Sequence, residues 1–131
     1  MAIQYVVVKD ARKEGTGLYY GRAIHPSTID LPVIAERIQR NSSMTKGDVL
    51  AVLTEMVSVM KDELQNSNKV KLNGLGTFYV SLRTKGVSEE EKFNANDNVK
   101  AFTVNFLAEG RKQNGKMVRT FTDGIKAVKA V

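Results

Sequence analysis

The side chains in this sequence that are best suited to chemistry are cations, and the chemistry they suit is the binding of phosphate. One polar stretch, residues 81–100, contains four of them: Arg83, Lys85, Lys92 and Lys100. The same stretch is locally neutral, because it also contains Glu89, Glu90, Glu91 and Asp97. Residues 101–131 hold six basic side chains against two acidic ones, and the basic ones are Arg111, Lys112, Lys116, Arg119, Lys126 and Lys129. The positive surplus therefore lies at the two ends of the sequence, above all in this last segment.

The whole chain shares this bias. Twenty Lys and Arg against fourteen Asp and Glu give a formal net charge of +6 over 131 residues, with an isoelectric point near 9.6. This net positive charge favours a polyanion as the partner, and nucleic acid is the first candidate. The alternative is a solvated surface that only keeps the protein soluble, and charge alone does not decide between the two. The length and the 42% hydrophobic content predict one folded domain with short additions.

Side chains for catalysis are scarce. The sequence has no Cys, which excludes thiol catalysis and thiolate zinc sites and suits the cytoplasm. The single histidine, His25, precedes Pro26 in an apparent linker. The glutamate run at 89–91 lacks the alternating spacing and turn glycine of a calcium loop. We therefore expect no enzyme, no metal site, no cofactor and no small-molecule substrate. The apolar residues 3–8 are too few for a membrane span or an export signal.

Two helices are predicted in the first half of the chain. Asp30 can cap the first, which has a proline in its first turn and should end near Asn41. Thr45, with an acidic residue three positions later, should cap a second helix that runs to about Gln65. Its apolar stripe is wider than one short partner helix would cover. This stripe predicts burial on more than one side, by a dimer interface, by a packed sheet, or by both.

Strands are predicted on both sides of the helices. Residues 1–26 alternate β-prone runs with turn residues, as in a hairpin. After the helices, residues 69–72 and 78–82 alternate in polarity around a glycine turn, and residues 102–106 repeat this alternation. The polar residues 83–99 between them should project as a loop or arm. Asn114 and Gly115 favour a tight turn, and residues 125–129 are expected to close a short helix.

The segment Val70–Phe78, Val-Lys-Leu-Asn-Gly-Leu-Gly-Thr-Phe, resembles the hairpin signature Gly-Phe-Gly-Thr-Phe of the HU and IHF family of bacterial DNA-bending proteins. Gly74, Gly76, Thr77 and Phe78 stand where the signature requires them, and Leu75 replaces its central aromatic residue. The resemblance spans roughly residues 31–112, and the order of elements agrees with it. Residues 1–26 and about 113–131 lie outside the core of that family. The chain is thus similar to a divergent HU-like protein, of the HU-HIG type, with extensions at both ends.

The resemblance implies an α+β fold of the HU and IHF type. Two N-terminal helices would lie under a three-stranded antiparallel sheet with a projecting arm, preceded by an added β hairpin. It divides the chain into an N-terminal β extension (1–26), an HU-like DNA-binding core (27–112) and a basic C-terminal extension (113–131). It also implies an intertwined homodimer whose paired arms embrace double-stranded DNA without sequence preference, as in histone-like proteins that compact a cytoplasmic nucleoid.

One feature of the resembled family is missing. HU arms carry an Arg-Asn-Pro tip whose proline wedges between base pairs. The only prolines here, Pro26 and Pro32, precede or open the first helix. We therefore do not expect this chain to insert a proline between base pairs. Stiffening or coating of DNA is as well supported by the sequence as bending.

Arg83 is the first candidate for DNA contact, because it follows the hairpin where the resembled family places arginines at the base of the arm. The further candidates are Lys85, Lys92, Lys100, Arg111, Lys112 and Lys116. Lys69 and Lys71 face away from the apolar side of their strand, and we expect a plain solvent-facing role for them. The alternative function is an HU scaffold without DNA binding that serves protein interaction or self-assembly. The acidic residues of the arm favour that alternative, whereas the net charge favours DNA.

Overall fold

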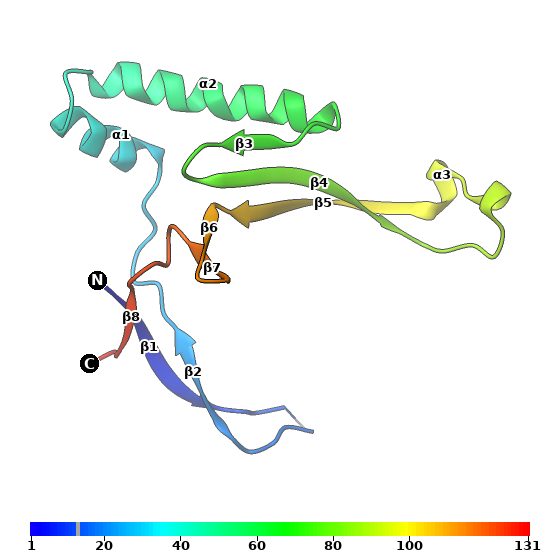
Figure 1. Cartoon of the computed structure of the whole chain (residues 1–131), viewed down its shortest axis with the longest axis horizontal. Helices are drawn as coiled ribbons and strands as arrows, with labels where there is room; N and C mark the ends of the chain where they lie inside the picture. The colour runs from blue at the N-terminus through cyan, green and yellow to red at the C-terminus, as the bar shows by residue number, and fades with distance from the viewer. Residues whose placement is uncertain (13) are drawn as a thin grey trace.

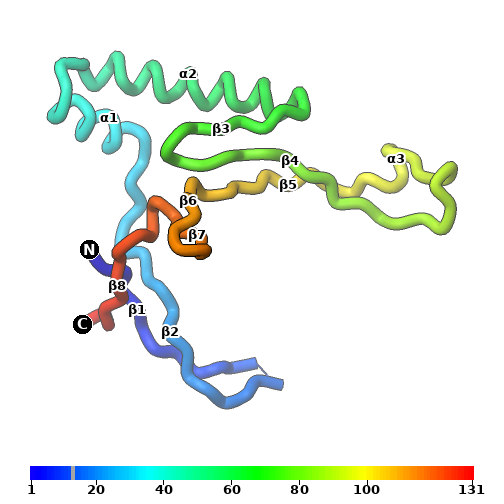
Figure 2. The backbone as a smooth tube through the Cα atoms, in the orientation of Figure 1, coloured from blue at the N-terminus to red at the C-terminus, as the bar shows by residue number. Residues whose placement is uncertain are grey.

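A computed structural model describes residues 1–12 and 14–131 of the chain. Its elements, in order, are β1 (Ala2–Lys9), β2 (Tyr19–Ala23), α1 (Leu31–Arg40), α2 (Lys46–Gln65), β3 (Val70–Leu72), β4 (Gly76–Thr84), η1 (Glu90–Lys92), α3 (Ala95–Asn98), β5 (Val99–Ala108), β6 (Gly110–Gln113), β7 (Lys116–Arg119) and β8 (Lys126–Lys129). Figures 1 and 2 show α1 and α2 above the β3-β4-β5 sheet, with the β6–β7 hairpin and the β2-β1-β8 sheet below it. The chain is therefore a mixed α+β protein.

Both predicted helix caps are confirmed. The side chain of Asp30 accepts a hydrogen bond from the backbone N–H of Val33, and that of Thr45 accepts one from Asp48. Each bond satisfies a donor that the first turn of a helix leaves free. The two helices pack on each other at Ala35 and Val49, which are 0% and 4% exposed.

The central sheet is antiparallel in the order β3-β4-β5. Its register places three apolar pairs on the face toward α2: Phe78 opposite Phe106, Val80 opposite Val104, and Leu82 opposite Phe102. The rings of Phe78 and Phe106 are stacked with their centroids 4.7 Å apart. Such cross-strand pairs stabilise a sheet and fix its register, because a slip of one residue would move the whole apolar set to the other face.

The hairpin of β4 and β5 extends well past α2 and ends in residues 85–98 (Figure 1). This tip contains η1 and α3 and is held together by Asn98, which is only 8% exposed. The side chain of Asn98 accepts from Asn94 N at 2.8 Å and donates to the carbonyl oxygen of Lys85 at 3.3 Å. Hydrogen bonds across its neck therefore close the tip of the arm.

The two ends of the chain form one sheet. β1 pairs antiparallel with β2 and parallel with β8, so that β1 is the middle strand. The short helix expected at residues 125–129 is wrong, because Lys126–Lys129 form β8. A helix of about one turn has little stability of its own, whereas the free edge of β1 offers a row of backbone hydrogen bonds. The tight turn at Asn114 and Gly115 is confirmed; both residues have positive φ and join β6 to β7.

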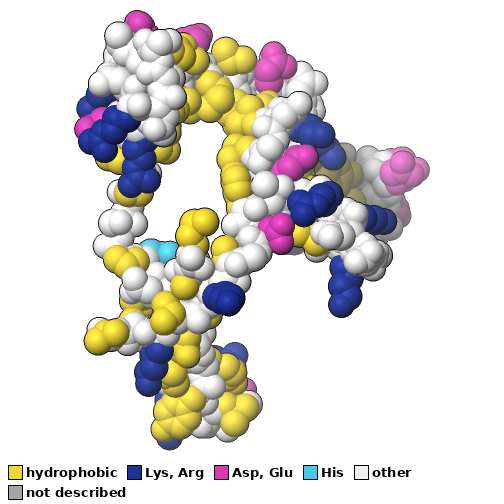
Figure 3. Space-filling model, turned by 60° about the vertical axis from the view of Figure 1, so that its left-hand side comes forward, with side chains coloured by type: hydrophobic (Ala, Val, Ile, Leu, Met, Phe, Trp, Pro, Cys, Tyr) yellow, Lys and Arg dark blue, Asp and Glu magenta, His cyan; other side chains and the backbone are white. Residues whose placement is uncertain are grey.

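The single chain buries little apolar surface. Among the described residues, only Ala35 and Val49 are buried hydrophobic residues, and the accessible surface is 11020 Å². A folded monomer of 14.5 kDa has an accessible surface of about 6,900 Å². Figure 3 shows apolar side chains on the surface and an opening between the helical part and the lower β part. The chain alone therefore leaves much apolar surface in contact with water.

Candidate nucleic-acid interface

The face of the central sheet that points away from α2 is polar and carries cations. In the antiparallel register, Lys71 lies opposite Thr77, and Arg83 lies opposite Ala101. The ammonium of Lys69 lies 5.1 Å from the centroid of the Tyr79 ring. The sequence predicts this face only in part. Alternation put Lys69 and Lys71 on the polar side of their strand, but only the register of β3 with β4 places them on the same face as Arg83.

Arg83 itself lies in β4, next to an irregularity in the pairing with β5 between Arg83 and Thr84. It is exposed, and in the described part of the chain no salt bridge or side-chain hydrogen bond holds its guanidinium. An exposed guanidinium has five N–H donors that fit two phosphate oxygens at once. Arg83 is thus available for an anion.

The other three cations of the arm are engaged to different degrees. Lys92 lies 3.5 Å from Glu89 in a salt bridge, and the ammonium of Lys100 donates to the carbonyl oxygen of Asp97 at 2.7 Å. The backbone of Lys85 is tied into the tip, but its exposed side chain has no such bond within residues 1–12 and 14–131. Arg83 and Lys85 are therefore the more accessible pair.

The β6–β7 hairpin divides its predicted cations between two faces. Arg111 lies opposite Val118 and Lys112 opposite Met117, so the two side chains point to opposite sides. Lys116, opposite Gln113, shares the face of Arg111. Arg111 also forms a salt bridge with Asp123 at 3.2 Å. The structure therefore brings Arg111 and Lys116 together and separates Lys112 from them.

These cations lie on the β4–β5 strand pair and on the elements next to it. Arg83 lies near the outer end of β4, Lys71 lies opposite Thr77 near its inner end, and the β6–β7 hairpin follows the inner end of β5 (Figure 1). The ten residues of β5 span about 33 Å, since each residue of a strand advances about 3.3 Å. That length corresponds to about ten base pairs of duplex at about 3.4 Å each.

The glycine signature has a structural role. A Cβ atom on Gly76 would clash with the ring of Phe106 and lie 2.5 Å from the carbonyl oxygen of Leu107, and φ at Gly76 is +152°. Gly74, at φ +87°, makes the turn that precedes it. These two glycines let β3, β4 and β5 approach closely at the base of the arm. They position the polar face and do not contribute side chains to it.

A third group of charges holds the loop between β1 and β2. The Asp10 carboxylate accepts from Nε and Nη2 of Arg12, both at 3.0 Å, and from the backbone N–H of Thr16 at 3.2 Å. The Arg12 guanidinium holds the pKa of the Asp10 carboxyl below its usual value, and the same contact raises the pKa of Arg12. Arg12 is therefore committed to this loop, unlike Arg83.

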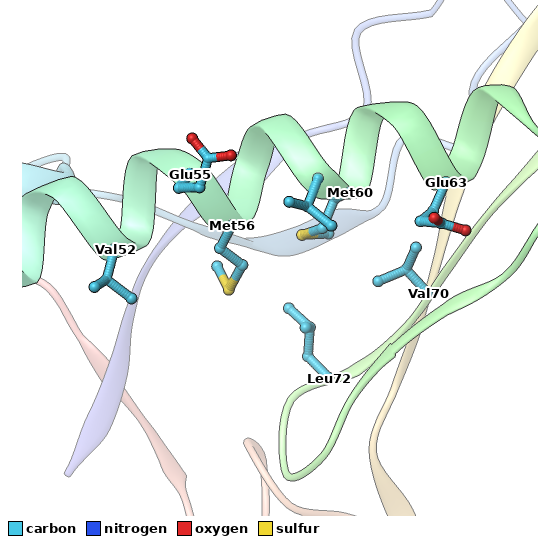
Figure 4. A pocket seen from close by; sticks show the side chains of 8 residues that line it. Val52, Glu55, Met56, Met60, Glu63, Val70 and Leu72 are labelled. Atoms are coloured by element: carbon cyan, nitrogen blue, oxygen red, sulfur yellow. The ribbon is translucent and has the colours of Figure 1, made fainter.

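Two apolar hollows flank α2. One, of about 410 Å³, lies between α2 and β3, and in Figure 4 the side chains of Met56, Met60, Val70 and Leu72 surround it. The other, of about 830 Å³, lies between the second half of α2 and the β4–β5 hairpin. Its walls include Phe102 and Val104, which are 72% and 64% exposed. These hollows correspond to the wide apolar stripe that the sequence of the second helix predicts.

Within 1–12 and 14–131, no group of three or more His, Cys, Asp or Glu side chains could hold a metal ion. None of the helices described is long and apolar enough to cross a bilayer.

Comparison with known proteins gives two structural relatives and one family. A crystal structure of a putative bacterial DNA binding protein from Bacteroides vulgatus superposes with a TM-score of 0.62 at 13% identity, and the match covers 98% of this chain and 49% of that one. This chain therefore spans about half the length of that protein. An Anabaena HU–DNA cocrystal structure matches with a TM-score of 0.49 at 17% identity, over 72% of this chain and 95% of that chain. The comparison with curated proteins found no significant match.

The first superposition shows a shared fold at a level of identity that says nothing about activity. The family comparison does bear on what the chain is: the family described as "HU domain fused to wHTH, Ig, or Glycine-rich motif" matches residues 1–122, which include β1, β2 and the whole arm. The predicted resemblance to HU-like proteins is thereby confirmed. The chain belongs to the HU-HIG family.

Proposed function

We propose that this protein is a histone-like, architectural protein of the nucleoid that binds double-stranded DNA without sequence preference. The observation that carries the proposal is the cationic polar face of the central sheet, which ends at Arg83, whose guanidinium has no salt-bridge partner among the described residues. Membership of a family with an HU domain supports it. Binding would take place in the cytoplasm, with neither a cofactor nor a small-molecule substrate.

The proposed contacts fall into two groups. Arg83 and Lys85, together with Lys69 and Lys71, would meet phosphates along the central sheet and the arm. Lys92, Lys100, Arg111, Lys112 and Lys116 would add weaker contacts, since several of them already have partners. Lysine and arginine contacts to phosphate position a protein on DNA and carry no sequence information. Sequence-tolerant binding that weakens steeply with salt follows from such contacts.

The proposed DNA-binding unit is a homodimer built on residues 27–112. The surface of the single chain exceeds that of a typical monomer by about 4,000 Å². Obligate dimers bury about 2,000–5,000 Å² over both chains, mostly apolar, which is about 1,000–2,500 Å² for each chain, so one dimer interface would cover part of this excess. The hollows on both sides of α2 would accept the α2 helix and sheet of a second copy. Two arms would then project from one body and reach the same duplex.

A charge-reversal experiment tests the proposal. Arg83→Glu should weaken binding to a random-sequence duplex at least tenfold, because it replaces an attraction for phosphate by a repulsion in both arms. The slope of log affinity against log salt concentration should fall by about two for the dimer, or one for each arm. Fluorescence anisotropy titrations over a range of salt concentrations measure both quantities, and a competitor of unrelated sequence checks sequence tolerance.

Lys46→Glu is the matched control. It changes the net charge by the same amount, but Lys46 begins α2, far from the arm (Figure 1). The control should keep near-normal affinity. Equal affinities of the wild-type protein and Arg83→Glu would refute the proposed interface, and absence of binding by the wild type at low salt would refute the proposed function.

A further inference from the structure

The β2-β1-β8 sheet has two open edges. β1 is its middle strand, and in the part of the chain that the structure describes no strand pairs with the outer side of β2 or of β8. An unpaired strand edge presents a row of N–H and C=O groups to any strand of matching register. The edges at β2 and β8 differ in how well they suit pairing with another strand.

The outer edge of β2 is ready for pairing. Asp10 N donates to Leu18 O at 2.9 Å at one end of the β1–β2 pair, and Ile24 N donates to Gln4 O at 2.9 Å at the other. Residues of an antiparallel strand direct their backbone groups alternately toward one neighbour and the other. The even-numbered residues of β2 therefore face β1, and the odd-numbered residues face outward. These outward residues are Tyr19, Gly21 and Ala23.

The sequence of β2 is self-complementary around Gly21. If two copies of β2 pair antiparallel about this residue, Tyr20 of each copy lies opposite Arg22 of the other. Arg22 is the only charged residue of β2, so no like charges are opposed, and an arginine beside an aromatic ring is a favourable pair. On the other face, Tyr19, which is 67% exposed, lies opposite Ala23 of the second copy.

The edge at β8 has the opposite character. Its sequence is Lys-Ala-Val-Lys, so two of its four exposed residues are lysines. Lysine is a residue with which proteins protect open strand edges from pairing. The edge at β8 is therefore protected against pairing by its lysines, whereas the edge at β2 is open to it.

We propose that β2 is a self-association site, at which two copies of the protein join their β2-β1-β8 sheets into one continuous sheet across a twofold axis. The partner is a second copy of this chain, and the contact lies outside the arm and outside the hollows beside α2. The inference adds to the proposed function and does not depend on DNA. If the proposed homodimer also forms, each chain has two different twofold contacts, and the two together link copies into an open-ended string.

Two substitutions at one position test this pairing. Tyr20→Lys and Tyr20→Glu both remove the aromatic ring and its hydrogen bond of 3.0 Å to Thr16. They differ in the charge that they place opposite Arg22 of the second copy. Tyr20→Lys should weaken association of the sheets. The association constant of Tyr20→Glu should exceed that of Tyr20→Lys by about threefold to tenfold, because the pair with Arg22 occurs twice across the axis. Sedimentation velocity of the full chain without DNA, over a wide range of concentrations, measures this.

A cross-link gives an independent readout. The natural chain has no cysteine, so Gly21→Cys places a single thiol on the twofold axis. Directly hydrogen-bonded partners in an antiparallel pair have Cα atoms about 5.5 Å apart, within the range that a disulfide spans. Mild oxidation should give a covalent dimer in high yield. The control is Ala127→Cys in exposed β8, which should cross-link far less.

The outcomes separate this inference from the proposed function. Equal association of the lysine and glutamate variants, or equal cross-linking at positions 21 and 127, would overturn the β2 contact whatever the affinity for DNA. Loss of DNA binding in Arg83→Glu with intact cross-linking through position 21 would leave both proposals standing. A wild-type protein that fails to bind DNA but cross-links through position 21 would refute the function alone.

Discussion

At the scale of single residues, Gly76 is the glycine that leaves the least room for a side chain. Alanine there would place its Cβ against the ring of Phe106 and the carbonyl oxygen of Leu107, with φ in a region that side chains disfavour. Gly76→Ala should lower the free energy of unfolding by roughly 1–3 kcal/mol, the usual cost of overpacking. Chemical denaturation at a fixed protein concentration measures this value.

Gly47, in the first turn of α2, is the matched control. A Cβ added there meets no atom within 4 Å, and its backbone is helical. Gly47→Ala should therefore raise the free energy of unfolding, by up to about 1 kcal/mol, because alanine restricts the unfolded chain. If the free energy of unfolding changed in the same direction in both variants, the structural role assigned to Gly76 would be wrong.

At the scale of elements, the arm tip depends on one buried amide. Asn98→Ala leaves the N–H of Asn94 and the carbonyl of Lys85 without their side-chain partner, at a cost of about 1–3 kcal/mol. The cost falls on the tip, so backbone amides in residues 85–98 should exchange with solvent about tenfold faster or more. Hydrogen-exchange NMR resolves these amides. Asn96→Ala is the control, since within residues 1–12 and 14–131 only the backbone N–H of Asn96, and not its side chain, forms a hydrogen bond. Unchanged amide exchange in Asn98→Ala would refute the role of Asn98 in closing the tip.

Elements with local signals could be predicted from the sequence. The caps at Asp30 and Thr45, the turn at Asn114 and the alternation in β4 each depend on residues within a few positions of one another. β8 had no such signal, because its parallel partner β1 lies more than 115 residues away in sequence. For the same reason, the common face of Lys71 and Arg83 required the register between strands. Contact of these residues with DNA stays a prediction.

At the scale of the whole molecule, the exposed apolar surface decides what the folded unit is. A chain with two buried hydrophobic residues among those described, and with 11020 Å² of accessible surface, has too little apolar burial to offset the entropy of its ordered residues. A second copy that fills the hollows beside α2 would supply the missing burial. Folding and dimerisation should therefore occur together.

Coupled folding and dimerisation make the melting temperature depend on protein concentration, because mass action favours the dimer as concentration rises. Circular dichroism melts of the full chain should show Tm rising steadily with each tenfold increase in concentration. The Tyr20→Lys variant should show the same trend, since its substitution lies in β2 and not beside α2. A Tm that is independent of concentration in both proteins would mean that the single chain is stable alone, and the homodimer would then have to be abandoned.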